Sequence, residues 1–244
     1  MLNEMINPKI LVIPDIHGRN FWNEAVQKYP QVEIIFLGDY LDPYPNEKIS
    51  KYLALENFKE ILEFAKNNDN CQLLLGNHDM DYILEVEGSR KDIINASYIR
   101  SLFLNNIELF DFATIKEINN KINLFSHAPI LLEWVKEINE TTDAEKLVDK
   151  LNLSLINIEK KNIKFLKNIN HISTYRGGKH KWGSPIWCDV REVIYNQGSF
   201  LSGIDFNIFG HTQLENSIIE ENYACLDTRQ AYLIDTKGKI IELK

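Results

Sequence analysis

Aspartate, histidine and asparagine residues cluster directly behind several apolar runs of this sequence. The run "ILVI" is followed by "PDIHG", in which Asp15 and His17 flank a single residue, and comparable clusters occur in "GDYLD", "GNHD", "SHAP" and "GHT". The candidate side chains in chain order are Asp15, His17, Asp39, Asp42, Asn77, His78, Asp79, His127 and His211. Mixed ligands of these types suit divalent ions such as Mn, Fe or Zn. Two such ions close together can activate water and polarise a phosphoryl group, so the clusters predict a two-metal hydrolase.

The elements that must position these side chains alternate between strand and helix. Apolar runs of strand length occur at 9–14, 32–37, 72–75, 122–125 and 206–209. Apolar residues at helical spacing predict helices at 20–29 and 47–67. Strands that alternate with helices are typical of a parallel sheet, in which ligands gather outside the carboxyl ends of the strands. We therefore expect the strand ends to deliver their polar groups to one rim.

The second half of the chain predicts a different organisation. The stretch "TTDAEKLVDKLN" offers a cap before a helical apolar pattern, and "YRGGKHKWGSPIWCDV" is a loop rich in glycine, tryptophan and basic residues. The tail alternates and contains "TKGK", a plausible hairpin turn, which predicts antiparallel strands of a second layer. No linker separates domains, so we predict a single domain over 1–244 with a helical cap insertion at about 131–203.

Composition limits the classes of partner. The 244 residues carry a formal net charge of -8, which argues against general nucleic-acid binding, because phosphate backbones are met by clustered Lys and Arg. An acidic balance does not disfavour a phosphate substrate held by bound metal. The three cysteines form no CxxC pair, which is typical of reduced thiols, and no run approaches the ~20 apolar residues of a membrane span. We expect a cytoplasmic protein without membrane contact.

Together, the blocks "PDIHGR", "GDYLD", "GNHD", "SHAP" and "GHT" resemble those of the calcineurin-like metallophosphoesterases, in family order. The single histidine of "GHTQ", the first block and the "LDT" at 226–228 most resemble the phosphoprotein phosphatase (serine/threonine phosphatase) branch of bacterial and phage type. The resemblance implies an α/β fold, a four-layer α/β/β/α sandwich. It also implies a metal-dependent phosphoesterase that hydrolyses phosphate monoesters with a water activated by two metals.

Carried over position by position, the resemblance implies a role for most of the candidates. Asp15 and His17 would bind the first metal, Asp39 would bridge both, and the second metal would take Asn77, His127 and His211. His78 would be the general acid, and Asp42 would orient it. The cofactors implied are two divalent ions, manganese first, with iron, zinc or magnesium as alternatives. The substrate would be a phosphorylated protein or a small-molecule phosphoester.

Departures from the family pattern affect the phosphate-binding side of the site. Pro43 and Tyr44 stand where the family has Arg-Gly, and that arginine grips the phosphate. Asp79 stands where the protein phosphatases usually have Glu, and Pro14 replaces a glycine. The sequence offers three arginines that could compensate, with the first preferred: Arg191, Arg19 and Arg176.

Two alternative functions remain open from the sequence. One is hydrolysis of a nucleotide, a dinucleoside polyphosphate or a cyclic nucleotide, since the family arginine is missing and Trp182 and Trp187 could stack on a base. The other is a non-catalytic metal-binding scaffold. The default interpretation of the tryptophans is packing, and His171 and His180, which lie outside the blocks, are expected to be exposed or hydrogen-bonded.

Overall fold

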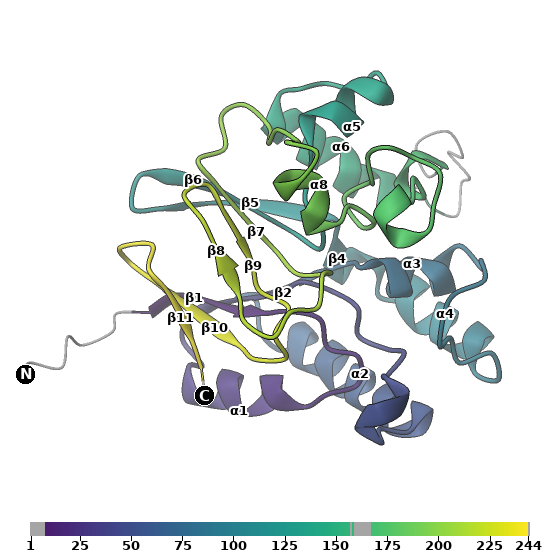
Figure 1. Ribbon diagram of the computed structural model, residues 1–244. Coiled ribbons are helices and arrows are strands. Elements are labelled where there is room, and N and C mark those ends of the chain that lie inside the picture. Colours follow the sequence, from purple (N-terminus) through teal and green to yellow (C-terminus); the bar gives the residue numbers. More distant parts are fainter. Residues whose placement is uncertain (1–7, 157, 159–166, 244) are drawn as a thin grey trace, which may run out of the picture.

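Two sheets lie against each other in the computed structural model, which describes residues 8–156, 158 and 167–243 (Figure 1). The first sheet has the order β11-β10-β1-β2-β3-β4 and consists of β1 (Pro8–Ile13), β2 (Glu33–Phe36), β3 (Cys71–Leu74), β4 (Phe110–Asp111), β10 (Tyr232–Asp235) and β11 (Ile240–Glu242). The second has the order β5-β6-β7-β9-β8 and consists of β5 (Ala113–Ile118), β6 (Lys121–Ser126), β7 (Phe206–Phe209), β8 (Ile218–Ile219) and β9 (Tyr223–Cys225).

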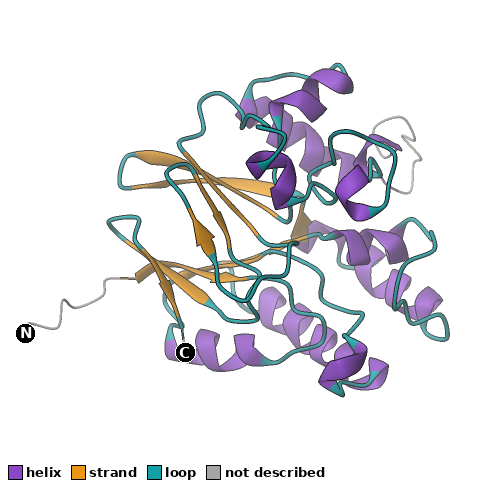
Figure 2. Cartoon of the chain, in the orientation of Figure 1, coloured by secondary structure: helices purple, strands orange, loops and turns teal. Residues whose placement is uncertain are grey.

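Helices lie outside both sheets (Figure 2). The α-helices are α1 (Phe21–Lys28), α2 (Lys51–Lys66), α3 (Asn77–Ile83), α4 (Ala96–Leu104), α5 (Leu132–Glu137), α6 (Ala144–Ile156) and α8 (Val190–Ile194). Short 3-10 turns are η1 (Pro45–Glu47), η2 (Ile107–Leu109) and η4 (Thr174–Arg176). In Figure 1, α1 and α2 cover the outer side of the first sheet, and α5, α6 and α8 lie on the opposite side of the molecule.

The alternation of side chains along each strand separates the layers. In β1, Leu11 and Ile13 belong to the core shared with the helices, whereas Ile10 and Val12 belong to the core between the sheets. That inter-sheet core also contains Phe125 of the second sheet, and the outer face of the second sheet packs against α8. The predicted α/β/β/α sandwich is therefore confirmed.

The start of α2 differs from the predicted helix at 47–67. Pro45 opens the 3-10 turn η1, and the helix begins only after Ser50, whose side chain accepts the main-chain N–H of Leu53 at 3.1 Å. A serine in this position satisfies one of the free N–H groups of the first helical turn, which fixes the start of the helix. Helical periodicity alone did not show this boundary.

Two predictions about the sheets are right only in part. The predicted single rim belongs to two sheets, because β1, β2 and β3 lie in the first and β6 and β7 in the second. The tail was predicted to form antiparallel strands of a second layer. Strands β8 and β9 do pair antiparallel in the second sheet, and β10 and β11 form an antiparallel hairpin at "TKGK", but this hairpin joins the first sheet. By pairing antiparallel with β1, β10 covers an edge that would otherwise expose free backbone groups. Strand β5 was not predicted.

The predicted cap region at 131–203 contains α5, α6, η4 and α8, while its residues 157 and 159–166 lie outside the described part. That this region is an insertion within a single domain stays a prediction. Within the described ranges, no helix combines the length and the apolar character that spanning a bilayer requires.

Candidate metal centre

The ends of five strands place the predicted ligands at one meeting point of the two sheets. Asp15 and His17 follow β1, Asp39 follows β2 and Asn77 opens α3 after β3, while His127 and His211 follow β6 and β7. These side chains are all buried, with at most 6% of their surface exposed. Short loops that leave buried strands thus bring residues far apart in the sequence into contact.

The backbone at this centre is strained. His17, Asp39, Asp42 and His211 have positive φ angles of 43°, 53°, 62° and 62°. Non-glycine residues adopt this conformation at a cost of order 1–3 kcal/mol each, and such strain concentrates at functional sites. The packing around these loops must therefore supply the stability that holds the side chains in position.

Two glycines allow the loops to approach each other. A Cβ atom at Gly76 would lie 2.1 Å from Asp39 Oδ1, and one at Gly210 would lie 2.2 Å from Asp15 Oδ1. Both distances are far below van der Waals contact, and the obstacles are buried carboxylates rather than flexible side-chain ends. The glycines of "GNHD" and "GHT" are thus required by the close approach of ligand side chains.

Two groups of potential ligand atoms share Asp39. The first joins Asp39 to His17 and His78, and the second joins it to His127 and His211. Asp39 Oδ2 lies 3.6 Å from Nε2 of His17 and 3.6 Å from Nε2 of His127. The geometry fits a pair of cations with a carboxylate between them, as in two-metal hydrolytic sites.

The other two predicted ligands border these groups. Asn77 Oδ1 lies 3.2 Å from His127 Nε2, beside the second group. Asp15 is not a member of either group, and its Oδ1 accepts the main-chain N–H of His211 at 3.0 Å. The structure therefore brings all the predicted ligands together, and their individual metal assignments stay predictions.

Hydrogen bonds to the main chain orient the histidine rings for metal binding. Nδ1 of His17 donates to the carbonyl oxygen of Leu41, and Nδ1 of His127 donates to that of Leu37, both at 2.8 Å. A carbonyl oxygen can only accept, so each Nε2 carries a lone pair on the side of Asp39. Nε2 of His211 is buried with no hydrogen-bond partner. These donor atoms fit divalent cations.

Burial sets the protonation states that metal binding needs. Burial would raise the pKa of Asp39, but the imidazoles of His127, His78 and His17 outweigh it and lower that pKa to about 2. Burial also lowers the pKa of His17 well below its usual value, and it does the same to His211, where Arg176 adds to the effect. The ionised carboxylate of Asp39 and the neutral imidazoles of His17 and His211 are the forms that coordinate metal.

His78 forms a hydrogen-bonded pair with Asp42 next to the first group. Nδ1 of His78 lies 2.8 Å from Oδ2 of Asp42, whose Oδ1 accepts the hydroxyl of Tyr82 at 2.5 Å. Burial works against protonation of His78, but Asp39 and Asp42 outweigh it and raise the pKa of the imidazole. The ring of His78 is thus fixed in orientation and retains a proton to higher pH than an ordinary histidine.

Asp79 connects the loops that carry the ligands. Its carboxylate accepts the main-chain N–H groups of Asp39 at 2.8 Å, Tyr40 at 3.1 Å and Gly76 at 2.8 Å. These bonds tie the loop after β2 to the loop after β3. Aspartate replaces the glutamate of the family pattern at this position, and its carboxylate still joins two loops of the site.

All three arginines predicted to bind phosphate have carboxylate partners. Arg19 binds Glu47 through Nε at 2.9 Å and Nη2 at 2.8 Å. Nε of Arg176 lies 2.7 Å from Asp189, and Nε of Arg191 lies 2.7 Å from the same carboxylate. Their contact with phosphate stays a prediction, and the phosphate would have to compete with the carboxylate that each arginine already binds.

Arg90 lies at the centre and was not identified from the sequence. Its guanidinium carbon stands 3.7 Å from the centre of the Tyr44 ring, and Nη2 lies 2.9 Å from Nε2 of His78. Its Nε is buried without a hydrogen-bond partner, and none of the ion pairs found among the described residues includes Arg90. Tyr44, one of the departures from the family pattern, thus supports an arginine from a different loop.

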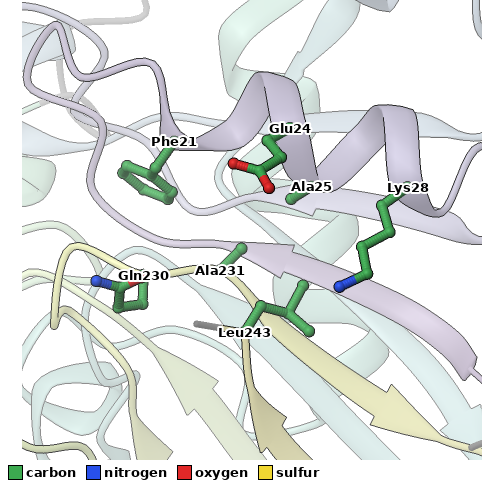
Figure 3. Close-up of a pocket in the computed structure, with 7 residues that line it drawn as sticks. All are labelled: Phe21, Glu24, Ala25, Lys28, Gln230, Ala231 and Leu243. Carbon is green, nitrogen blue, oxygen red and sulfur yellow. The ribbon is translucent and has the colours of Figure 1, made fainter.

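A separate small pocket lies beside α1 (Figure 3). Its volume is about 90 Å³, and it is lined by Phe21, Glu24, Ala25, Lys28, Gln230, Ala231 and Leu243. It contains none of the predicted ligands, so it does not form part of the metal centre.

Comparisons with known proteins agree with this geometry. The sequence matches the calcineurin-like phosphoesterase family over residues 8–214. The comparison with curated proteins finds no match. A solved structure of a cold-active protein tyrosine phosphatase has a TM-score of 0.60 and 16% identity, covering 98% of this chain and 79% of that one. A hypothetical protein from Pyrococcus horikoshii has a TM-score of 0.47 and 11% identity, covering 96% and 86%. At these identities the phosphatase shares the fold alone.

Proposed function

The chain belongs to the calcineurin-like phosphoesterase family, and we propose that it is a phosphate monoesterase that acts on phosphoserine or phosphothreonine in proteins. The observation that carries the proposal is the pair of His/Asp groups that share Asp39, with the His78–Asp42 pair directly beside them. This arrangement combines metal ligands with a group that can supply a proton. Both are needed to expel an alkoxide from a phosphate ester.

The metal ligands divide between two positions in this proposal. Asp15 and His17 would hold one ion, Asp39 would contribute to both, and the remaining ligands would hold the other: Asn77, His127 and His211. Mixed nitrogen and oxygen donors favour manganese, with iron, zinc or magnesium as the alternatives. Divalent ions at these positions would activate a water molecule and neutralise charge on the phosphoryl group.

His78 acts as the general acid in the proposed reaction. Asp42 holds Nδ1, so Nε2 is the atom that delivers the proton to the leaving oxygen. Asp39 and Asp42 raise the pKa of the imidazole, which favours the protonated form that an acid requires. A serine or threonine alkoxide is a poor leaving group and depends strongly on this proton.

Arg90 is the proposed ligand for the phosphate, in place of the family arginine that Pro43 replaces. Nη2 of Arg90 donates to Nε2 of His78, so it occupies the position from which His78 would contact the leaving oxygen. A protonated Nε2 cannot accept this bond. Protonation of His78 therefore releases the guanidinium, which then donates to phosphate oxygens in its preferred planar, bidentate geometry.

Exposed apolar side chains near Arg90 support a protein substrate. Ile93 and Ile94 are 83% and 94% exposed, in the same loop as Arg90. Nζ of Lys51 donates to the main-chain oxygen of Lys91 at 2.7 Å, which ties the start of α2 to this loop. The next residues of α2, Tyr52 and Leu53, are also exposed. Such a surface can bind apolar side chains that flank a phosphorylated residue in a protein, whereas a nucleotide carries no aliphatic side chains that could pack against it.

The experiment that tests this proposal compares substrates on protein stripped of metal and reloaded with Mn, Mg or Zn. We expect metal-dependent hydrolysis of an aryl phosphate monoester and of a phosphoserine peptide, at least about tenfold faster than of a diester or a nucleotide. A tenfold preference for nucleotides would instead support the nucleotide hydrolase. Metal-loaded, folded protein that hydrolyses none of them would support the scaffold.

The peptide part of the proposal has its own control. Replacing Ile93 and Ile94 by serine should raise KM for a phosphopeptide with apolar flanks about 30-fold, since each of the two lost apolar contacts is worth ~1 kcal/mol. The same variant should leave hydrolysis of the small aryl phosphate unchanged. An equal loss on both substrates would show that the loop supports the site rather than the peptide.

A further inference from the structure

A second group of metal-ligand side chains lies outside the centre described above. It consists of Glu137, the last residue of α5, and of His171 and His180 in the loop that surrounds η4. Their ligand atoms lie within 4.8 Å of one another. Nδ1 of His171 is buried and has no hydrogen-bond partner, and the two imidazole rings stack at 3.8 Å between centres. The family motifs do not include these residues.

Main-chain hydrogen bonds fix the loop that presents the two histidines. The N–H of His180 donates to the oxygen of Ile172 at 3.1 Å, and the oxygen of His180 accepts the N–H of Thr174 at 2.9 Å. The oxygen of His171 accepts the N–H of Ser184 at 2.9 Å. Both imidazoles thus leave a closed turn whose backbone is already ordered, and ordered ligands lower the entropic cost of binding an ion.

We propose that Glu137, His171 and His180 form a further metal site, which takes Zn²⁺ or a similar transition-metal ion. Two histidines and one glutamate are a known zinc donor set, to which a water adds the fourth ligand. Ligand atoms around a tetrahedral zinc lie about 3.4 Å apart, given bond lengths of about 2.0–2.2 Å. Oε1 of Glu137 lies 3.4 Å from Nδ1 of His180 and 3.8 Å from Nδ1 of His171.

Ion binding requires the two rings to turn. They are almost parallel, with an angle of 12° between their planes, so their in-plane lone pairs do not converge on one point. The side chains are 17% and 22% exposed, so both rings reach the surface, and rotation about the Cβ–Cγ bond would turn their lone pairs toward an ion. The metal-bound state should therefore lose the ring stacking, a change that histidine signals in NMR spectra report directly.

The site links α5 to a loop that supports the catalytic centre. The same loop carries Arg176, whose Nη2 donates to the main-chain oxygen of His211 and to Thr212 Oγ1, both at 2.9 Å. An ion held between Glu137 and the two histidines fastens this loop at its other end. The site is thus structural, and it stands whether or not the proposed phosphatase function is correct.

The test measures zinc bound by protein whose catalytic centre has lost key ligands, in the background Asp39→Asn/His127→Ala. In this background, Glu137→Gln is compared with Glu140→Gln, which removes a nearby carboxylate that pairs with Lys150 and belongs to neither metal site. We expect Glu137→Gln to weaken the binding of one zinc ion more than about tenfold, and Glu140→Gln to leave it unchanged. His171→Ala and His180→Ala should each reproduce the loss.

Histidine NMR completes the experiment. Adding Zn²⁺ to the background protein should shift the ring signals of His171 and His180, and Glu137→Gln should abolish the shift at equal zinc concentration. The proposal is overturned if the ring signals do not move, or if Glu137→Gln and Glu140→Gln bind zinc alike. Because no activity is measured, failure here is distinct from failure of the proposed phosphatase reaction.

Discussion

The loops at the strand ends carry the ligands of the metal centre, whereas the segment 131–203 carries polar side chains that are more exposed. His17, Asp39 and His127 are at most 2% exposed, and main-chain hydrogen bonds fix their loops or rings. In the second region, the side chain of Arg191 is 45% exposed and that of His180 is 22% exposed. The first region therefore has little freedom to adjust, and substitutions there should cost most.

The largest loss is expected for Asp39→Asn. The amide keeps the shape but removes the negative charge between the two groups of ligands, so the proposed ions lose their bridge. Because metal ions contribute several kcal/mol to stabilising a phosphoryl transition state, turnover of a phosphate monoester should fall about 10⁴-fold. Metal content by mass spectrometry should fall in parallel, while circular dichroism stays native. Wild-type turnover in this variant would refute the two-metal site.

A smaller but more diagnostic loss is expected for His78→Asn. General acids contribute about 10²- to 10⁴-fold, and the loss should lie in that range for a phosphoserine peptide, whose leaving group needs a proton. For an aryl phosphate with an acidic phenol the loss should be much smaller. The measurement is kcat for both substrates at saturating manganese. Equal losses would assign His78 to metal binding, as its place in the first ligand group allows.

The pH profile tests the partner of this acid. Since Asp39 and Asp42 raise the pKa of His78 despite its burial, the protonated acid persists above the usual imidazole value of 6.5. Activity is then retained below the raised pKa and lost as the pH rises through it. Asp42→Asn removes one of the two charges and should move the alkaline limb of kcat/KM to lower pH. An unmoved limb would mean that a different group titrates.

Arg90 belongs to neither of the two regions compared above, since it lies in the loop between α3 and α4. Arg90→Met keeps an apolar side chain over Tyr44 but removes the cation. Charge-assisted hydrogen bonds are worth about 1.5–3 kcal/mol, so KM for the monoester and Ki for inorganic phosphate should rise about 10- to 100-fold. Arg100→Met, which removes an arginine paired with Glu85, is the control and should change neither constant.

The strand-end half of the site was predictable because its positions depend on local pattern. An apolar run followed by "PDIHG" fixes both the strand and the place where its ligands begin, and parallel neighbours then bring such ends together. The division of the strands between two sheets was not predictable in the same way. Periodicity identifies a strand but does not show its partners, so it did not show that β6 and β7 lie in a different sheet from β1, or that β10 pairs with β1.

Arg90 was missed for a related reason. It stands twelve residues beyond His78 in the loop between α3 and α4, and no motif includes it. Its position depends on the ring of Tyr44, a residue from the loop after β2. A contact between two loops from separate parts of the chain produces no motif of fixed spacing in the sequence, whereas a ligand that follows a strand does.

The smallest effect is expected within the second region, where two arginines share Asp189. Arg191→Met removes a partly exposed partner of the buried Asp189, which keeps its ion pair with Arg176, so activity should fall less than about fivefold, or ~1 kcal/mol. Arg176→Met removes both the ion pair with Asp189 and the hydrogen bond to the main-chain oxygen of His211. Loss of a group that orients a metal ligand lowers metal affinity or activity about 10-fold or more, so this variant should lose more than Arg191→Met. Steady-state kinetics and manganese affinity, measured for both variants, test which arginine contributes more to the metal centre. If Arg191→Met instead raised KM 100-fold with manganese affinity intact, Arg191 would contact the phosphate, and this region would belong to the substrate site rather than to its support.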